Sequence, residues 1–233
     1  MRDPMTGATS IQSREGQLEL DPQALSHEVR AKLLLGLVVP RPIAVVSTVS
    51  ATGRFNIAPF SYYNVVSDEP MALGFSMTAP KPDGNDKDTL RNVRPIEEGG
   101  IGEFVINVAT QNYAPAMVRA GVSLPYGSSE FEFAPLTPAP SRTVRAPRIK
   151  EARACFECRT WKIIEIGLAH LVIGEVTHVA VQDSLVDERM RINLKQLQPV
   201  ARLAGTQYCL VKDPFDVTAD IAPDWLKKVT VGA

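Results

Sequence analysis

Apolar residues occur along the chain in short runs, and most of these runs have the length and composition of β-strands. Runs rich in β-branched and aromatic residues predict strands at residues 43–49, 54–60, 71–77 and 103–109. The turn Thr52-Gly53 joins the first two runs, as in a β-hairpin. Two longer runs, residues 154–166 and 169–181, are separated by Gly167 and are expected to form an antiparallel pair.

Helical patterns are shorter and lie between these strands. An apolar stripe of Leu25, Val29 and Leu33 predicts a helix from about residue 23 to 35, with Asp21 and Pro22 as its cap and first turn. Further short helices are expected at residues 89–97, at residues 112–121 and near Asn193.

The balance of elements favours one mainly β domain. Residues 125–150 are rich in Pro, Ser and Thr and predict a long loop, which in an ordered protein tends to be functional or to cover something. We interpret residues 18–233 as a single barrel with short peripheral helices, preceded by an extended or disordered tail at residues 1–17.

Composition and charge exclude some classes of protein but do not identify a function. The formal net charge of −1 gives no indication of nucleic-acid binding. No apolar run approaches the roughly 20 residues that a membrane span needs. The polar start of the chain lacks the apolar core of a signal peptide, and three cysteines suggest no disulfide framework, so we expect a cytoplasmic protein.

Several familiar catalytic and metal motifs are absent. The sequence has no G-x-G-x-x-G after a strand, no phosphate-binding P-loop, no G-x-S-x-G and no H-E-x-x-H. Cys155 and Cys158 lie on a predicted strand, where positions three apart face opposite sides, so we interpret both as structural. His170 and His178 are too far apart on one strand to share a ligand. No metal site is expected.

The polar run NDKDTLRNV, residues 85–93, follows directly after a strand-like segment. Lys87, Asp88 and Thr89 bring a lysine and a hydroxyl to the start of a predicted helix, which is a favourable place for an anion. The alternative is an ordinary helix cap on a solvated face. If an anion does bind here, we expect Asp88 to cap the helix rather than to contact the anion, because a carboxylate repels it.

Other small polar residues lie at the ends of strands. Ser47 and Thr48 close the first strand, while Asn56, Ser61 and Asn64 follow along the returning one. Hydroxyls, amides and one lysine suit a polar ligand that carries a phosphate, since a well-placed lysine–phosphate contact contributes about 1.5–3 kcal/mol. A hairpin without any ligand is the alternative for each residue taken alone.

Three motifs in this order resemble one protein family. They are P-R-P-I-A at residues 40–44, N-x-A-P-F-S at residues 56–61 and K-D-T at residues 87–89. Together with EFVINVAT at 103–110 and PVARLAGTQY at 199–208, the chain resembles the flavin reductase-like family over residues 18–208. This family comprises FMN-binding split β-barrels, including flavoredoxins and the reductase components of two-component monooxygenases.

The resemblance implies a homodimer that binds FMN near the subunit interface. Carried over by position, Ser47 and Thr48 contact the ribityl and phosphate region, and Lys87, Asp88 and Thr89 hold the phosphate. The remaining contacts implied around the flavin come from Asn56, Ala58, Pro59, Ser61, Asn64, Arg202 and Tyr208. The turn before K-D-T, APKPDGNDKDT, is longer than the resemblance leads us to expect.

Three functions remain open at this point. In the first, NADH or NADPH reduces the flavin, which passes electrons to free flavin, oxygen or a partner monooxygenase, so the cofactor supplies the chemistry. The second is a non-catalytic FMN electron carrier. The third is a split barrel that uses another cofactor, such as heme or a deazaflavin. The sequence does not distinguish NADH from NADPH.

Overall fold

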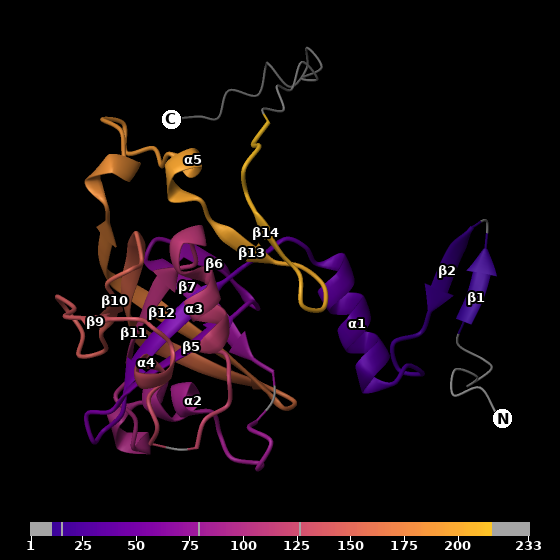
Figure 1. The fold of residues 1–233 in the computed structure, drawn as a ribbon. Coiled ribbons are helices and arrows are strands. Elements are labelled where there is room, and N and C mark those ends of the chain that lie inside the picture. The colour runs from indigo at the N-terminus through magenta and orange to yellow at the C-terminus, as the bar shows by residue number, and fades with distance from the viewer. Residues whose placement is uncertain (1–10, 15, 79, 126, 216–233) are drawn as a thin grey trace, which may run out of the picture.

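A computed structural model describes residues 11–14, 16–78, 80–125 and 127–215, and its elements are mainly strands (Figure 1). One antiparallel sheet of seven strands dominates, with the strand order β5-β4-β8-β11-β12-β7-β6. Its strands are β4 (Ala44–Val49), β5 (Phe55–Phe60), β6 (Tyr63–Asp68), β7 (Met71–Met77), β8 (Glu103–Val108), β11 (Ala154–Ile166) and β12 (Ala169–Val181). The sheet curls into the split β-barrel expected from the sequence.

A second, smaller sheet lies beside the barrel and joins segments that are far apart in the sequence. It has the order β14-β13-β3, and its strands are β3 (Arg41–Pro42), β13 (Val200–Arg202) and β14 (Tyr208–Leu210). Because β3 directly precedes β4, this sheet brings the C-terminal segment next to the P-R-P-I-A motif.

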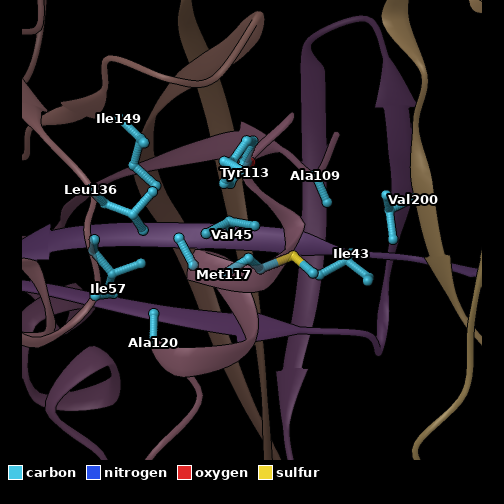
Figure 2. Packing of buried hydrophobic residues seen from close by; sticks show 12 residues of the cluster. Ile43, Val45, Ile57, Ala109, Tyr113, Met117, Ala120, Leu136, Ile149 and Val200 are labelled. Carbon is cyan, nitrogen blue, oxygen red and sulfur yellow. The ribbon is translucent and has the colours of Figure 1, made fainter. Parts of the chain in front are cut away.

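Short helices cover parts of the barrel. They are α2 (Asp88–Val93), η1 (Ile96–Glu98), η2 (Gln111–Tyr113), α3 (Ala114–Arg119), α4 (Glu130–Phe133), η3 (Asp183–Leu185) and α5 (Leu194–Leu197). Helix α3 packs over β4 and β5 in one core cluster, where Met117 lies near Val45 and Ile57 (Figure 2). The barrel interior holds a second cluster, in which Phe75 packs edge-on against Phe104 with ring centroids 5.5 Å apart.

An N-terminal arm projects away from the barrel (Figure 1). It consists of the hairpin β1 (Ile11–Arg14) and β2 (Gln17–Leu20), followed by helix α1 (His27–Leu37). No residue of α1 is buried, and Leu34 and Leu37 are more than half exposed. The arm therefore presents apolar surface that its own barrel does not cover.

A buried carboxylate, Glu157 on β11, accepts several hydrogen bonds from the long loop at residues 125–150. Its oxygens accept hydrogen bonds from the backbone N–H of Arg142 at 2.8 Å, from the N–H and hydroxyl of Thr143, and from Nε of Arg148 at 2.7 Å. Burial alone would raise the pKa of Glu157, but these hydrogen bonds outweigh it and lower the pKa to about 2. These hydrogen bonds hold this part of the loop against the barrel. The loop contains two short strands, β9 (Pro138–Ala139) and β10 (Arg148–Ile149).

Some predicted boundaries were wrong. The first helix begins after Ser26, whose hydroxyl accepts a hydrogen bond from Val29 N, and not at residue 23. Asp21 instead accepts a bond from Gln23 N in the turn before the helix. The helix expected at 89–97 is α2 followed by the separate turn η1, and Gly99 ends the second with a φ of 83°. Of the expected tail at 1–17, residues 1–10 and 15 lie outside the described part of the chain.

The two cysteines expected to be structural are free and buried. Cys155 and Cys158 belong to different core clusters, and burial raises the pKa of both thiols. Within the described ranges, no group of three or more potential metal-ligating side chains is found, and no helix there is both long and apolar enough to span a membrane.

Candidate functional site

Two pockets meet beneath the start of α2, and Pro59, Phe60 and Lys87 line both. The first, here called the Glu130 pocket, has a volume of about 100 Å³. Its walls are Asn56, Ala58, Pro59, Phe60, Lys81, Lys87, Asp88, Thr89, Ala120, Gly121, Val122, Ser123, Leu124 and Glu130. The second, the Arg41 pocket, has a volume of about 350 Å³. Its walls are Leu35, Arg41, Pro59, Phe60, Ser61, Tyr62, Ser76, Thr78, Lys87, Arg202, Leu203 and Gly205.

Lys87 is the cation at the junction of the two pockets. Its backbone has the extended conformation of an N-cap residue, and its side chain makes no capping hydrogen bond. The side chain is half-buried, and no carboxylate of the described chain forms an ion pair with it. A cation placed in this way attracts an anionic group of a ligand, because its charge is partly desolvated and not neutralised.

Lys81 and Asp88 form a buried ion pair beside Lys87. Nζ of Lys81 lies 2.8 Å from Oδ1 of Asp88, and both side chains are 9% exposed. The same Nζ donates to the carbonyl of Leu124 at 3.1 Å. The expectation that Asp88 caps the helix was wrong, since Lys87 occupies the N-cap position and Asp88 is the first helical residue. Asp88 is neutralised by Lys81, which the sequence analysis did not identify.

A buried hydrogen-bond network supports the floor of the Glu130 pocket. Nδ2 of Asn56 donates to the hydroxyls of Thr48 at 3.2 Å and Thr89 at 3.0 Å. Nδ2 of Asn92 donates to the same Thr48 hydroxyl at 2.9 Å. The network joins β4, β5 and α2, so it fixes the position of Thr89 at the pocket wall. Asn56 and Thr89 line the pocket, whereas Thr48 supports them from behind.

Glu130 closes the pocket from the long loop and was not predicted. It is 5% exposed, and its Oε2 accepts a hydrogen bond from Ile57 N at 3.0 Å, on the outer edge of β5. Burial raises the pKa of the Glu130 carboxyl, against the lowering effect of the bond from Ile57. Glu130 thus joins the long loop to the outer edge of β5 at the wall of this pocket.

The other predicted residues occupy three different environments. Ser47 faces the interior, where its hydroxyl donates to the carbonyl of Pro147 and accepts from Asn107. Asn64 is exposed on β6, and its Oδ1 accepts from the neighbouring Val65 N. Ser61 lines the Arg41 pocket. The structure therefore brings Ser61 to the pockets through its side chain, and does not do so for Ser47.

Arg202 and Tyr208 act together on the far side of the Arg41 pocket. Nη1 of Arg202 donates to the Tyr208 hydroxyl, Nη2 donates to the carbonyl of Gly205, and the guanidinium stacks 4.4 Å from the centre of the tyrosine ring. Only Arg202 of the pair lines the pocket. Arg41, which the sequence analysis quoted only as part of a motif, is the other arginine of this wall.

This arrangement can bind an extended ligand with an anionic group. The described pocket walls combine unpaired cations, hydroxyls and the flat surfaces of Pro59, Phe60 and Tyr62. The lining residues described for these walls include no cysteine or histidine.

Comparison with known proteins decides the family. The flavin reductase like domain matches residues 35–197, most of the chain. The chain belongs to the flavin reductase-like family. An uncharacterised protein of Aquifex aeolicus is 43% identical over 177 residues, which is 76% of this chain and 87% of the relative.

Two solved structures are similar to this chain over most of their length. Component B of nitrilotriacetate monooxygenase from Bacillus cereus aligns with a TM-score of 0.80 and 34% identity, over 86% of this chain and 98% of that one. The 2-nitrobenzoate 2-nitroreductase of Pseudomonas fluorescens aligns with a TM-score of 0.77 and 30% identity, over 88% and 98%. This flavin reductase-like protein is thus a flavin oxidoreductase in the general sense.

Proposed function

We propose that this flavin reductase-like protein binds FMN with its phosphate at Lys87. The observation that carries the proposal is the half-buried ammonium of Lys87 at the junction of two pockets, which forms no ion pair in the part of the chain that the structure describes. Thr89 supports it, because its hydroxyl accepts from Asn56 and so keeps its own proton to donate to an oxygen in the pocket.

The residues present fit the rest of such a cofactor. Ala58, Pro59 and Ser61 lie on β5 and just beyond it, and form a wall that runs from the Glu130 pocket to the Arg41 pocket. The small volume of the first pocket suits a terminal phosphate, which favours FMN over FAD. When bound, the flavin supplies the capacity to accept hydride and pass on electrons. The protein supplies binding, orientation and a local charge.

We further propose that NADH or NADPH is the reductant, and that electrons pass to free flavin, oxygen or a partner oxygenase. The proposal draws on the similarity to component B of a monooxygenase. The alternative is an electron carrier that does not react with a nicotinamide. For such a carrier, the flavin stays oxidised in the titration described next.

Anaerobic titration of the FMN-loaded protein with NADH and with NADPH tests this function. We expect the visible absorbance band of the oxidised flavin to bleach on addition of one equivalent of NADH, of NADPH, or of either. If the flavin stays oxidised after both additions, the nicotinamide reaction is excluded and the FMN electron carrier is the remaining function. Failure to take up FMN in gel filtration, with haem or a deazaflavin retained instead, would defeat the proposal itself.

A homodimer is the third part of the proposal, and exposed apolar surface supports it. Val65 and Val66 on β6 are 68% and 50% exposed, and Leu34 and Leu37 on α1 are also open to solvent. A stable dimer commonly buries about 1,200–2,000 Å² in total, for which such surface is suited.

We expect light scattering at micromolar concentration to give the mass of two chains. Val65→Asp should shift the equilibrium towards one chain, because it would bury a charge in the interface. Val118→Asp is the matched control, since Val118 is an exposed valine on α3. A single-chain mass for the parent protein would contradict the dimer.

A further inference from the structure

Two arginines face each other across the small sheet next to the flavin site. Arg41 on β3 and Arg202 on β13 are Cα partners in an antiparallel ladder. Like charges at directly opposite positions destabilise a pair of strands. No carboxylate of the described ranges forms an ion pair with either of them. The arrangement lacks the negative charge that usually accompanies a buried guanidinium.

Arg41 is 5% exposed and held in one orientation. Its Nη1 donates to the carbonyls of Leu35 at 2.8 Å and Val38 at 2.7 Å, and its Nη2 donates to the carbonyl of Leu203 at 2.9 Å. Nε lies 3.4 Å from the Ser61 hydroxyl. A guanidinium has five N–H groups, so one N–H of Nη2 remains without a partner in the described structure.

The walls around these arginines carry only positive charge. The Arg41 pocket contains Arg41, Lys87 and Arg202, and none of its lining residues is an aspartate or a glutamate. Hydroxyls of Ser61 and Tyr62 lie on the same wall. Lys87 is assigned to the FMN phosphate above, which leaves the arginine pair for a second anionic group.

An apolar pocket adjoins this cationic one and shares Arg41, Ser61 and Tyr62 with it. It has a volume of about 320 Å³, within the range of small-molecule sites. Its walls are Leu34, Val38, Pro40, Arg41, Pro42, Ser61, Tyr62, Tyr63 and Asn64. Aromatic and proline side chains present flat surfaces, which suit a planar ring.

We propose that the two adjoining pockets bind a small aromatic carboxylate as a second ligand. The ring lies in the apolar pocket, between the tyrosines and the end of α1, and the carboxylate meets Arg41 and Arg202. Planar guanidinium groups match a carboxylate through paired N–H···O bonds. The place of this ligand beside a flavin rests on the proposed function, whereas the binding site itself rests on the arginines and the apolar pocket.

Calorimetric titration of the FMN-loaded protein with benzoate tests the site, with benzamide as a neutral ligand of the same shape. We expect benzoate to bind at least about 10-fold more tightly than benzamide, as one charge-assisted contact is worth about this factor. Phenyl phosphate and NADH complete the series, because an aryl phosphate or a nicotinamide nucleotide shares the ring and the negative charge.

Two variants locate the site. Arg202→Gln should weaken benzoate by about 10-fold or more and leave benzamide unchanged, while Arg189→Gln, at an exposed arginine that lines neither pocket, should alter neither. Val38→Trp should fill the apolar pocket and weaken both ligands, with the arginines intact. Thermal unfolding of each variant confirms that it is folded.

The outcomes separate the site from the cofactor. Equal binding of benzoate and benzamide, an unchanged affinity in Arg202→Gln, or tighter binding of phenyl phosphate or NADH than of benzoate would overturn the proposal. Displacement of FMN by benzoate would do the same, since the arginines would then belong to the flavin. If the protein takes up no FMN at all, the proposed function fails, and benzoate titration of the cofactor-free protein still decides this site.

Discussion

Lys87→Ala should weaken FMN binding by roughly 10- to 150-fold. The change removes one charge-assisted contact, worth about 1.5–3 kcal/mol, and 1.4 kcal/mol corresponds to a factor of ten. The fold should survive, because a half-buried lysine without an ion-pair partner contributes little to the core. With FMN in excess, the maximum rate of flavin reduction should return to near that of the parent, since the phosphate lies at the far end of the cofactor from the ring.

Fluorescence titration of the cofactor-free protein with FMN, together with stopped-flow reduction at saturation, measures both quantities. Lys87→Arg should retain most of the affinity because it keeps the charge. Lys162→Ala, at an exposed lysine on β11, serves as the control. An affinity within about twofold of the parent in Lys87→Ala would remove the phosphate contact from this residue. A rate that stays low at saturation would give Lys87 a role in hydride transfer.

Glu157→Gln should lower the free energy of unfolding at pH 7 by about 3–5 kcal/mol. This is the usual cost of removing one partner of a buried ion pair and leaving the other charge uncompensated. Arg148 would lose its carboxylate, and the backbone N–H groups of Arg142 and Thr143 would lose their charged acceptor. Urea unfolding at pH 7 measures the difference.

The effect should depend on pH in a defined window. The pKa of Glu157 in the folded chain is about 2, below its ordinary value of 4.5. A depressed carboxyl pKa stabilises the folded state above the unfolded pKa, and this stabilisation is lost as pH falls from about 4.5 towards 2. The difference between parent and Glu157→Gln should therefore shrink below pH 4.5.

Glu103→Gln is the matched control for Glu157. Glu103 on the neighbouring strand β8 also accepts hydrogen bonds from an arginine of the same loop, Arg145, at 2.8 Å and 3.2 Å. That arginine side chain is 56% exposed, so we expect a loss of at most about 1 kcal/mol. Equal losses in the two variants, or a difference independent of pH, would show that the buried carboxylate does not anchor the loop.

The main strands could be predicted because their residues pack on both faces or alternate regularly. Strands β7, β11 and β12 begin and end at the predicted residues. Strand β6 was missed since it follows β5 after two residues and exposes Val65 and Val66, so it carries no buried pattern. The strands β3, β13 and β14 have two or three residues each and depend on pairing between distant segments, which a local pattern does not reveal.

Residues of the site could be predicted where a motif is local. Asn56, Lys87 and Thr89 do lie together at one pocket, although their contact with a flavin stays a prediction. Lys81 was hidden in a turn that was noted only for its length. Glu130 reaches Ile57 across 73 positions of the sequence, and such a contact follows from the fold rather than from spacing.

The two outer strands of the large sheet differ in a way that limits how copies of the chain can join. The outer edge of β5 is covered, because the Glu130 carboxylate accepts a hydrogen bond from the N–H of Ile57 and helix α4 lies over this strand. In the described part of the chain no strand lies beyond β6. A sheet with two free edges can add copies without end and grow into a fibre, whereas a sheet with one can pair once with itself about a twofold axis and then stop. A change that removed both the Glu130 carboxylate and the cover of α4 would free this second edge, and its first sign would be filaments at high protein concentration.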